Sequence, residues 1–190
     1  SSQRQMCIRG SYLFNTGANA YSYRALGCHG FLDGGQRCFR FAVWAPNARY
    51  VNVVGDFNGW DCTKGVMSRC GTTGVWEAVL YDVKLGDCYK FAILTQSGEL
   101  IFKADPFAFY SQARPETASV VADIGGYAWG DSDYMEQRAV KDHVRLPVSI
   151  YEVHAGSWRE GMSYRKLAEE LIPYVKEMGY THIEFMPLAE

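Results

Sequence analysis

Tryptophan side chains in a stretch of short, β-type segments are the residues best suited to bind a ligand. Trp44, Trp60 and Trp76 are candidates, because a flat ring covers the C–H face of a sugar while polar neighbours bond to its hydroxyls. A tryptophan inside a strand is more often buried, and strand alternation places at least one of Trp44 and Trp76 in a core. Trp60 lies in the glycine-bounded loop 55–61, where ligand binding and packing explain it equally well.

Charged side chains give weaker signals. Lys90 lies in the middle of an apolar run, so a solvated outward position is the simpler interpretation and donation to sugar oxygens is the alternative. In a (β/α)₈ barrel, active-site groups gather at the carboxyl ends of the strands, which would bring His154 and Glu190 near that face. Glu152 and Glu184 lie inside apolar runs and indicate buried structural pairs. No couple of carboxyl groups suited to glycosidic cleavage is identifiable, so we assign no catalytic residue.

Composition excludes several classes of function. The formal net charge of −2 comes from 19 basic and 21 acidic residues without long runs of one sign, which predicts a neutral partner, no nucleic acid and no anionic membrane. No P-loop, dinucleotide or serine-nucleophile motif is present, and we expect no cofactor. Without a signal-like apolar stretch, we expect reduced thiols in a cytoplasmic protein. No metal site is expected, because six cysteines are scattered without a CxxC pair: Cys7, Cys28, Cys38, Cys62, Cys70 and Cys88.

The central part of the chain has the pattern of a small antiparallel sandwich. We expect residues 1–36 to be a lead-in, residues 37–125 to form the sandwich, and residues 126–146 to be a linker with a helical turn at 134–140. Residues 120–124 would form a closing edge strand. The other expected strands are short apolar segments separated by turns, and they cover residues 39–43, 50–54, 75–81, 88–94 and 99–103.

Residues 147–190 read as one strand–helix–strand unit. Ser163 caps the expected helix, Gly179 ends it, and Pro173 should kink or restart it. A parallel pair of strands needs neighbours on both edges and cover on both faces. We therefore expect this unit to open an α/β domain whose remainder lies beyond Glu190. One side of the helix should be buried, at Leu167, Leu171, Val175 and Met178.

Several segments, in this order, resemble the N-terminal part of the bacterial 1,4-α-glucan (glycogen) branching enzymes of the α-amylase superfamily. The similarity covers nearly everything after residue 12, and DPFAF with RPETAS and YEVHAGSW together favour branching over related enzymes. The matching segments are FAVWAPNARYVNVVGDFNGWD at 41–61, VWEAVL at 75–80, YKFAI at 89–93, KADPFAFYSQARPETASVV at 103–121, SIYEVHAGSWR at 149–159 and SYRKLAEELIPYVKEMGYTHIEFMPLAE at 163–190.

This resemblance implies an all-β, immunoglobulin-like sandwich of the starch- and glycogen-binding type, followed by the first β-α-β unit of a (β/α)₈ catalytic barrel. The parent enzyme would cleave an α-1,4-glucan through a covalent glycosyl-enzyme and transfer the chain to a 6-hydroxyl. Its Asp nucleophile, Glu acid/base and second Asp would lie beyond Glu190, so this chain alone should be inactive. The implied partners are α-1,4-glucan or glycogen and the rest of the catalytic domain.

The resemblance also implies binding residues. Trp60 and Lys90 match the residues that hold glucan in such modules, while Trp44 and Pro46, with the loop near Gly74, match an oligosaccharide groove of branching enzymes. Kinase-type modules carry a second tryptophan where this chain has Leu100, so that platform is incomplete. Two alternatives remain open: a non-catalytic glycogen-binding or targeting module, and a sister debranching or trehalose-releasing hydrolase.

Overall fold

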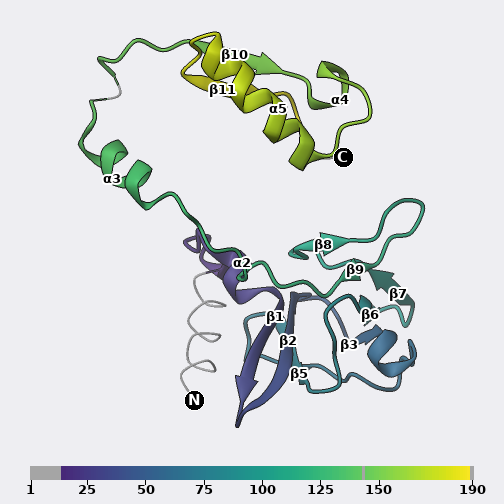
Figure 1. Cartoon of the computed structure of the whole chain (residues 1–190). Helices are drawn as coiled ribbons and strands as arrows, with labels where there is room; N and C mark the ends of the chain where they lie inside the picture. Colours follow the sequence, from purple (N-terminus) through teal and green to yellow (C-terminus); the bar gives the residue numbers. More distant parts are fainter. Residues whose placement is uncertain (1–13, 143, 189–190) are drawn as a thin grey trace. The chain divides into compact units, whose positions relative to one another are not determined.

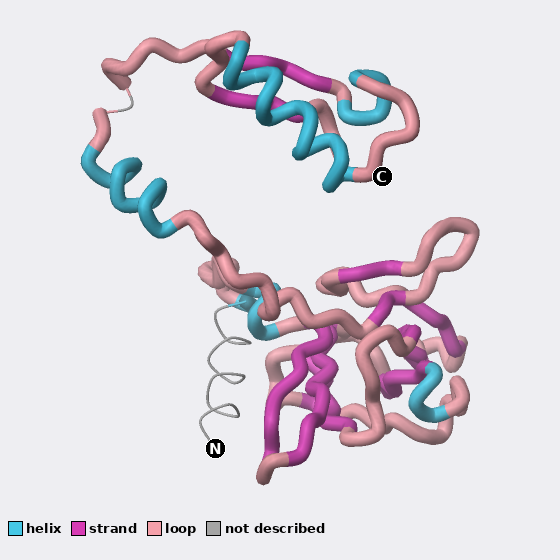
Figure 2. The backbone as a smooth tube through the Cα atoms, viewed as in Figure 1, coloured by secondary structure: helices cyan, strands magenta, loops and turns pink. Residues whose placement is uncertain are grey.

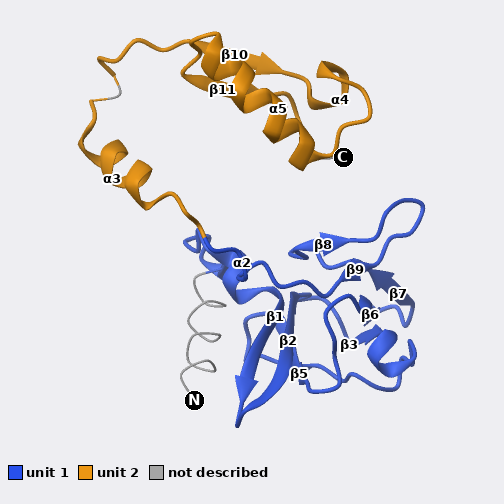
Figure 3. Cartoon of the chain, viewed as in Figure 1, with its two compact units in different colours: residues 1–128 blue, residues 129–190 orange. Residues whose placement is uncertain are grey.

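The computed structural model describes residues 14–142 and 144–188, and the chain divides into two compact units, residues 1–128 and residues 129–190 (Figure 3). Most strands belong to the first unit, and the longest helix belongs to the second (Figure 2). Over the described ranges, every helix is too short or too polar to cross a membrane.

Two antiparallel sheets make up the first unit (Figure 1). One sheet has the order β1-β2-β5-β4, with β1 at Gly27–Asp33, β2 at Gln36–Trp44, β5 at Val75–Leu80 and β4 at Ser68–Arg69. The other has the order β3-β6-β9-β8, and β7 also pairs with β6. Its strands are β3 at Tyr50–Gly55, β6 at Cys88–Leu94, β7 at Leu100–Lys103, β8 at Tyr110–Ser111 and β9 at Ser119–Val120. The first unit is therefore a mostly β, sandwich-like domain.

The core of this unit follows from strand alternation. Every second residue of β2, β3 and β6 is apolar and packs in one cluster, while the residues between them face away. Trp76 is buried in this cluster, which agrees with the prediction that at least one of Trp44 and Trp76 lies in a core. Its indole N–H donates to the carbonyl of Ala45 at 3.0 Å. Most of the other large members are aromatic or β-branched, and they include Phe39, Phe41, Val43, Val51, Val53, Tyr89 and Phe91, with Met67 as the exception.

Two strands differ from the sequence expectation. Residues 1–36 were expected to lie outside the sandwich, yet β1 pairs with β2 along its whole length. It escaped prediction because only its first two residues, Gly27 and Cys28, are buried, so it shows no clean alternation. Residues 120–124 were expected as an edge strand, but β9 is shorter and lies between β6 and β8. The short β8 forms that edge instead.

The segment before β1 covers the outer face of the first sheet. It includes the short helix α2 (Ser22–Ala25), after which Leu26 is fully buried. Leu26 packs with Ala42 and Val75 of the sheet, and Phe14 and Phe107 lie against the same cluster. The first sheet is therefore buried on both faces near the end where β2 stops.

The second unit contains a parallel pair of strands, β10 (Ile150–Val153) and β11 (His182–Phe185), connected by the helix α5 (Tyr164–Glu177). The Ser163 hydroxyl accepts from the backbone N–H of Lys166 at 3.3 Å, which confirms the predicted cap. The helix continues through Pro173, so this proline does not restart it. The other helices of the unit are α3 (Ser132–Val140), at the predicted helical turn, and α4 (Ala155–Trp158).

One face of α5 is buried at Leu167, Leu171 and Val175, which pack with Val153 of β10. The prediction was wrong for Met178, whose side chain is 58% exposed. Met178 lies one residue beyond the end of α5, and the following Gly179 has the left-handed conformation (φ +80°) that ends a helix. The helical spacing therefore stops applying before Met178 is reached.

A buried carboxylate, Asp105, connects the segment after β7 to β6, and its backbone N–H connects the same segment to β9. The Tyr89 hydroxyl donates to Asp105 Oδ2 at 2.7 Å, and the Phe107 N–H donates to Asp105 Oδ1 at 2.8 Å. The backbone N–H of Asp105 donates to the Ser119 hydroxyl at 2.8 Å. Burial raises the pKa of the Asp105 carboxyl, although both donors and the nearby His29 oppose this shift.

This raised pKa predicts how stability depends on pH. The protonated carboxyl is favoured by folding, so its contribution is fully present below the unfolded pKa, about 3.9, and is lost as pH rises through the higher folded pKa. Asp105→Asn keeps a neutral group with an acceptor and a donor. We expect its free energy of unfolding, relative to wild type, to increase as the pH rises above about 4, because wild type must then bury an ionised carboxylate.

Urea unfolding at several pH values measures this difference. Asp82→Asn, at an exposed position, is the matched control and should leave the pH dependence unchanged. Parallel stability curves for Asp105→Asn and wild type would contradict the expectation.

Candidate carbohydrate-binding surfaces

The loop 55–61 is a closed turn built on the end of β3. Residues Asp56–Asn58 form a 3₁₀ turn, and Gly59 adopts a left-handed conformation. The Asn58 side chain accepts from the N–H of Gly55 at 3.0 Å and donates to the carbonyl of Val53 at 3.0 Å. The backbone N–H of Trp60 donates to the Gly55 carbonyl at 3.0 Å and so closes the turn. These bonds fix the position from which the Trp60 ring projects.

Trp60 has an unusual backbone conformation and a partly exposed ring. Its φ of +61° is the one positive value for a non-glycine residue in the part of the chain that the structure describes. Such a conformation costs on the order of 1–3 kcal/mol and persists where surrounding contacts impose it. The ring is 38% exposed, and its indole N–H donates to Asp56 Oδ1 at 2.9 Å. The same carboxylate accepts from the Cys88 N–H at 2.8 Å, which links the ring to β6.

A second carboxylate follows Trp60 in the chain. The Thr63 side chain and backbone N–H donate to Asp61 and hold its pKa below the ordinary value. The residue after Trp60 is therefore an ionised, hydrogen-bonded acceptor.

Lys90 projects from the outer face of β6, because its neighbours Tyr89 and Phe91 face the core. It lies opposite Val54, near the end of β3 from which the Trp60 loop departs. Its ammonium group donates to the Thr117 hydroxyl at 2.7 Å. Trp60 and Lys90 are thus at the same end of the β3–β6 pair, and the ammonium group is held in place by a neutral oxygen.

The neighbouring strand adds two exposed apolar side chains to this outer face. Phe102 lies opposite Ala92, and Leu100 lies opposite Leu94, so both point to the same side as Lys90. Phe102 is 47% exposed and Leu100 is 46% exposed. Leu100 is the position where the sequence departs from kinase-type modules, whereas Phe102 was not predicted, although alternation along the expected strand 99–103 places it on the same face as Leu100.

Trp44, Pro46 and Gly74 come together at the other end of the sandwich. A β-carbon added to Gly74 would lie 2.7 Å from Pro46 Cβ and 3.1 Å from the indole nitrogen of Trp44, so glycine is the residue that allows this contact. The Ala45 N–H donates to the Gly74 carbonyl at 2.9 Å. Trp44 is 47% exposed, and its ring packs edge-on against Phe14 with 5.7 Å between centroids.

The five predicted binding residues therefore fall into two groups. Trp60 and Lys90 lie where Gly55 pairs with Tyr89, whereas the turn after Trp44 leads to Tyr50, which pairs with Leu94 at the opposite end of the same strands. Sequence spacing alone does not distinguish these ends. No group of three or more metal-ligating side chains occurs within the described ranges.

The second unit holds a separate cavity of about 610 Å³ beyond the carboxyl ends of β10 and β11. His154 lines it, and its Nδ1 lies 2.8 Å from the Ser157 hydroxyl; Glu190 lies outside the described residues. Glu152 and Glu184 were predicted to be buried, but both are exposed and lie side by side in register. They occupy the face of the strand pair opposite to that packed by α5, which explains their exposure.

Comparison with known proteins shows which families this sequence is similar to. Residues 25–108 match the family model of carbohydrate-binding module 48 (isoamylase N-terminal domain). The chain is 47% identical over 184 residues to the 1,4-alpha-glucan branching enzyme GlgB of Desulfitobacterium hafniense, covering 94% of this chain and 29% of the relative. It is 48% identical over 185 residues to GlgB of Rhodospirillum rubrum, covering 94% and 25%. This chain is homologous to the N-terminal region of 1,4-alpha-glucan branching enzymes.

The chain spans less than a third of the length of these curated relatives. A solved structure described as an alpha amylase from Salmonella typhimurium is also similar, with 25% identity, a TM-score of 0.62, and coverage of 87% of this chain and 25% of that one. The sequence resemblance to branching enzymes is confirmed for the N-terminal region of those proteins.

Gly74 provides a test of the Trp44 group. Gly74 has φ +78°, so Gly74→Ala would carry a left-handed penalty of about 1–2 kcal/mol as well as a collision with Pro46. We expect a larger loss of stability than for Gly71→Ala, where φ is +57° and the added β-carbon meets nothing. Urea unfolding measures both losses, and tryptophan emission reports displacement of Trp44. Equal losses in the two variants would show that the Pro46 contact is unimportant.

Proposed function

We propose that this chain is the glucan-binding N-terminal part of a 1,4-α-glucan branching enzyme. The observation that carries the proposal is the exposed Trp60 ring, fixed by Asp56 and set at the Lys90 end of the outer face of β6. The homology to branching enzymes and the match to carbohydrate-binding module 48 support it.

The chemistry of this face suits a neutral sugar polymer. The Trp60 ring and the exposed side chains of Phe102 and Leu100 offer apolar surface to the C–H faces of glucose units. The Lys90 ammonium group offers donors to hydroxyl oxygens, and Thr117 already supplies it with one neutral oxygen of the same kind. Phe102 and Leu100 thus take the place of the second tryptophan of kinase-type modules.

We propose the domain organisation that follows from this assignment. Residues 37–125 are the immunoglobulin-like binding module, and β1 extends its sheet on the N-terminal side, beyond a lead-in within residues 1–36. Residues 126–146 connect it to residues 147–190, which are the first β-α-β unit of a (β/α)₈ catalytic barrel. The parallel pairing of β10 with β11 and the cover of α5 on one face support this.

The parent enzyme would transfer an α-1,4-glucan segment to a 6-hydroxyl in a retaining double displacement, with its carboxylates outside residues 1–190. Glu152 and Glu184 do not replace them. They are neighbours on one face of two adjacent strands, whereas cleavage needs carboxyl groups on opposite sides of the scissile bond. In this organisation the 190 residues bind glucan and are inactive alone.

Trp60→Ala tests the binding face. We expect this variant to lose retention on glycogen by about fivefold or more, because one aromatic contact contributes about 1 kcal/mol beyond area burial. Affinity electrophoresis in gels with and without glycogen measures the retention. Trp129→Ala, which removes an indole that is 75% exposed in the second unit, is the matched control. Unchanged mobility of Trp60→Ala would refute this binding face.

Hydrogen exchange tests the barrel assignment. The face of β10 and β11 away from α5 leaves Ile150 52% exposed, and each strand has one paired edge among the described residues. We therefore expect the amides of β10 and β11 to exchange at least tenfold faster than those of β2 and β6 in the same dilute sample. Equal protection of the two sets would contradict the idea that this unit is completed by further strands.

A further inference from the structure

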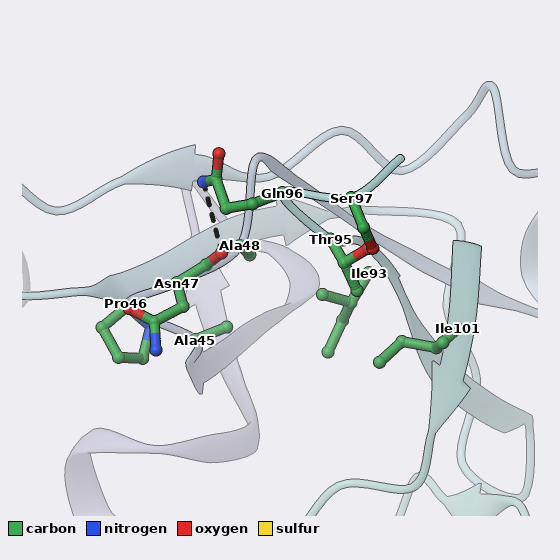
Figure 4. Close-up of a pocket in the computed structure, with 9 residues that line it drawn as sticks. All are labelled: Ala45, Pro46, Asn47, Ala48, Ile93, Thr95, Gln96, Ser97 and Ile101. Carbon is green, nitrogen blue, oxygen red and sulfur yellow. Dashed lines mark hydrogen bonds between the residues drawn. The ribbon is translucent and has the colours of Figure 1, made fainter. Parts of the chain in front are cut away.

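An open pocket of about 420 Å³ lies at the end of the sandwich that carries Pro46 (Figure 4). One wall is the turn of residues 45–48, and the other is the end of β6 with the turn of residues 95–97. Ile101 of β7 closes the side away from Pro46, as the close-up shows. These walls come from segments about fifty residues apart in the sequence, so no continuous sequence motif predicts the pocket.

The lining of the pocket is neutral and of two kinds. Ala45, Ala48 and the partly buried Ile93 and Ile101 form an apolar floor. Amide and hydroxyl side chains, from Asn47, Thr95, Gln96 and Ser97, lie around this floor. An apolar surface with a few polar groups, in a volume between about 300 and 1,000 Å³, is the usual character of a small-molecule site. Without an arginine, lysine or carboxylate in the lining, the pocket does not suit a phosphate or another charged ligand.

The pocket walls are held rigidly before any ligand binds. The Ala45 carbonyl accepts from the buried Trp76 indole at 3.0 Å, and the Ala48 carbonyl accepts from Arg69 Nη2 at 2.7 Å. The Gln96 side chain donates to the Asn47 carbonyl at 3.3 Å and so connects one wall to the other. Binding to such a preformed site loses little conformational entropy.

Pro46 belongs to both this pocket and the Trp44 group. Its ring lines the pocket, and its β-carbon is the atom nearest to the position that a Gly74 side chain would occupy beside Trp44. The exposed Trp44 ring, Pro46 and the pocket therefore form one continuous surface, with a flat aromatic at one end and polar side chains at the other.

We propose that this pocket is a further subsite that holds one neutral glucosyl unit of a chain lying across Trp44 and Pro46. The apolar floor contacts a C–H face of the sugar, and the amide and hydroxyl groups of Asn47 and Ser97 bond to its hydroxyls. This inference rests on the proposed function and extends it, because Asn47, Thr95, Gln96 and Ser97 have no role at the Trp60 face.

The test is an NMR titration of the ¹⁵N-labelled 190-residue chain with maltotetraose. We expect saturable shifts of the amides of residues 47–48 and 95–98, separate from those of residues 59–61. The double variant Asn47→Ala/Ser97→Ala should raise the Kd reported by the pocket amides at least threefold and leave the Kd reported by residues 59–61 unchanged. The matched control is Gln36→Ala/Ser111→Ala, which removes two polar side chains at exposed positions away from the pocket and should change neither Kd.

The outcomes separate this inference from the proposed function. Shifts confined to residues 59–61, or a double variant whose pocket amides keep the wild-type Kd, would overturn the subsite and leave the glucan-binding face standing. No saturable shift at either place would overturn both. Shifts at the pocket alone, abolished by the double variant, would uphold the subsite and remove the Trp60 face from the proposal.

Discussion

The antiparallel pairing of β3 with β6 determines what the first unit presents to its surroundings. Val53 lies opposite Phe91 and Val51 opposite Ile93, and these four side chains face the core. Because side chains alternate, Lys90 and Ala92 point away from this core cluster, and the pairing of β7 with β6 places Leu100 and Phe102 on the same side as them. A shift of one residue in this register would bury an ammonium group and expose Phe91.

The same alternation explains how much of the structure the sequence predicted. Strand positions and the burial of Trp76 follow from local periodicity, and the helix α5 follows from its cap and its spacing of apolar residues. β1 was missed because a strand that is buried only at its first two residues shows no period. The pocket beside Pro46 was missed for a different reason: its walls meet only through the pairing of β3 with β6, which the sequence does not display.

In the second unit, the sequence pattern predicted more burial than the structure shows. Its apolar strand runs were interpreted as buried on both faces, and Glu152 and Glu184 within them as buried pairs. In the structure one face packs against α5 and the other is open, so Glu152 and Glu184 are exposed. An apolar run shows that a strand can be buried, but it does not show which of its two faces the described residues cover.

Under the proposed function, the two ends of the β3–β6 pair would let the first unit hold a polymer through two weak contacts. Tyr50 and Val54 are four residues apart, which corresponds to about 13 Å along a strand. A single glucose unit can occupy only one end, whereas a chain, or two chains of one particle, can engage both. The second contact is then made at a high effective concentration, so avidity for a polymer exceeds the affinity of either end. The strand β6 sets this spacing between Lys90 and Leu94. Because the strand is rigid, binding at both ends loses little conformational entropy. Under the proposed function this arrangement would favour long glucans over free sugars, because the short ligand gains nothing from the second end.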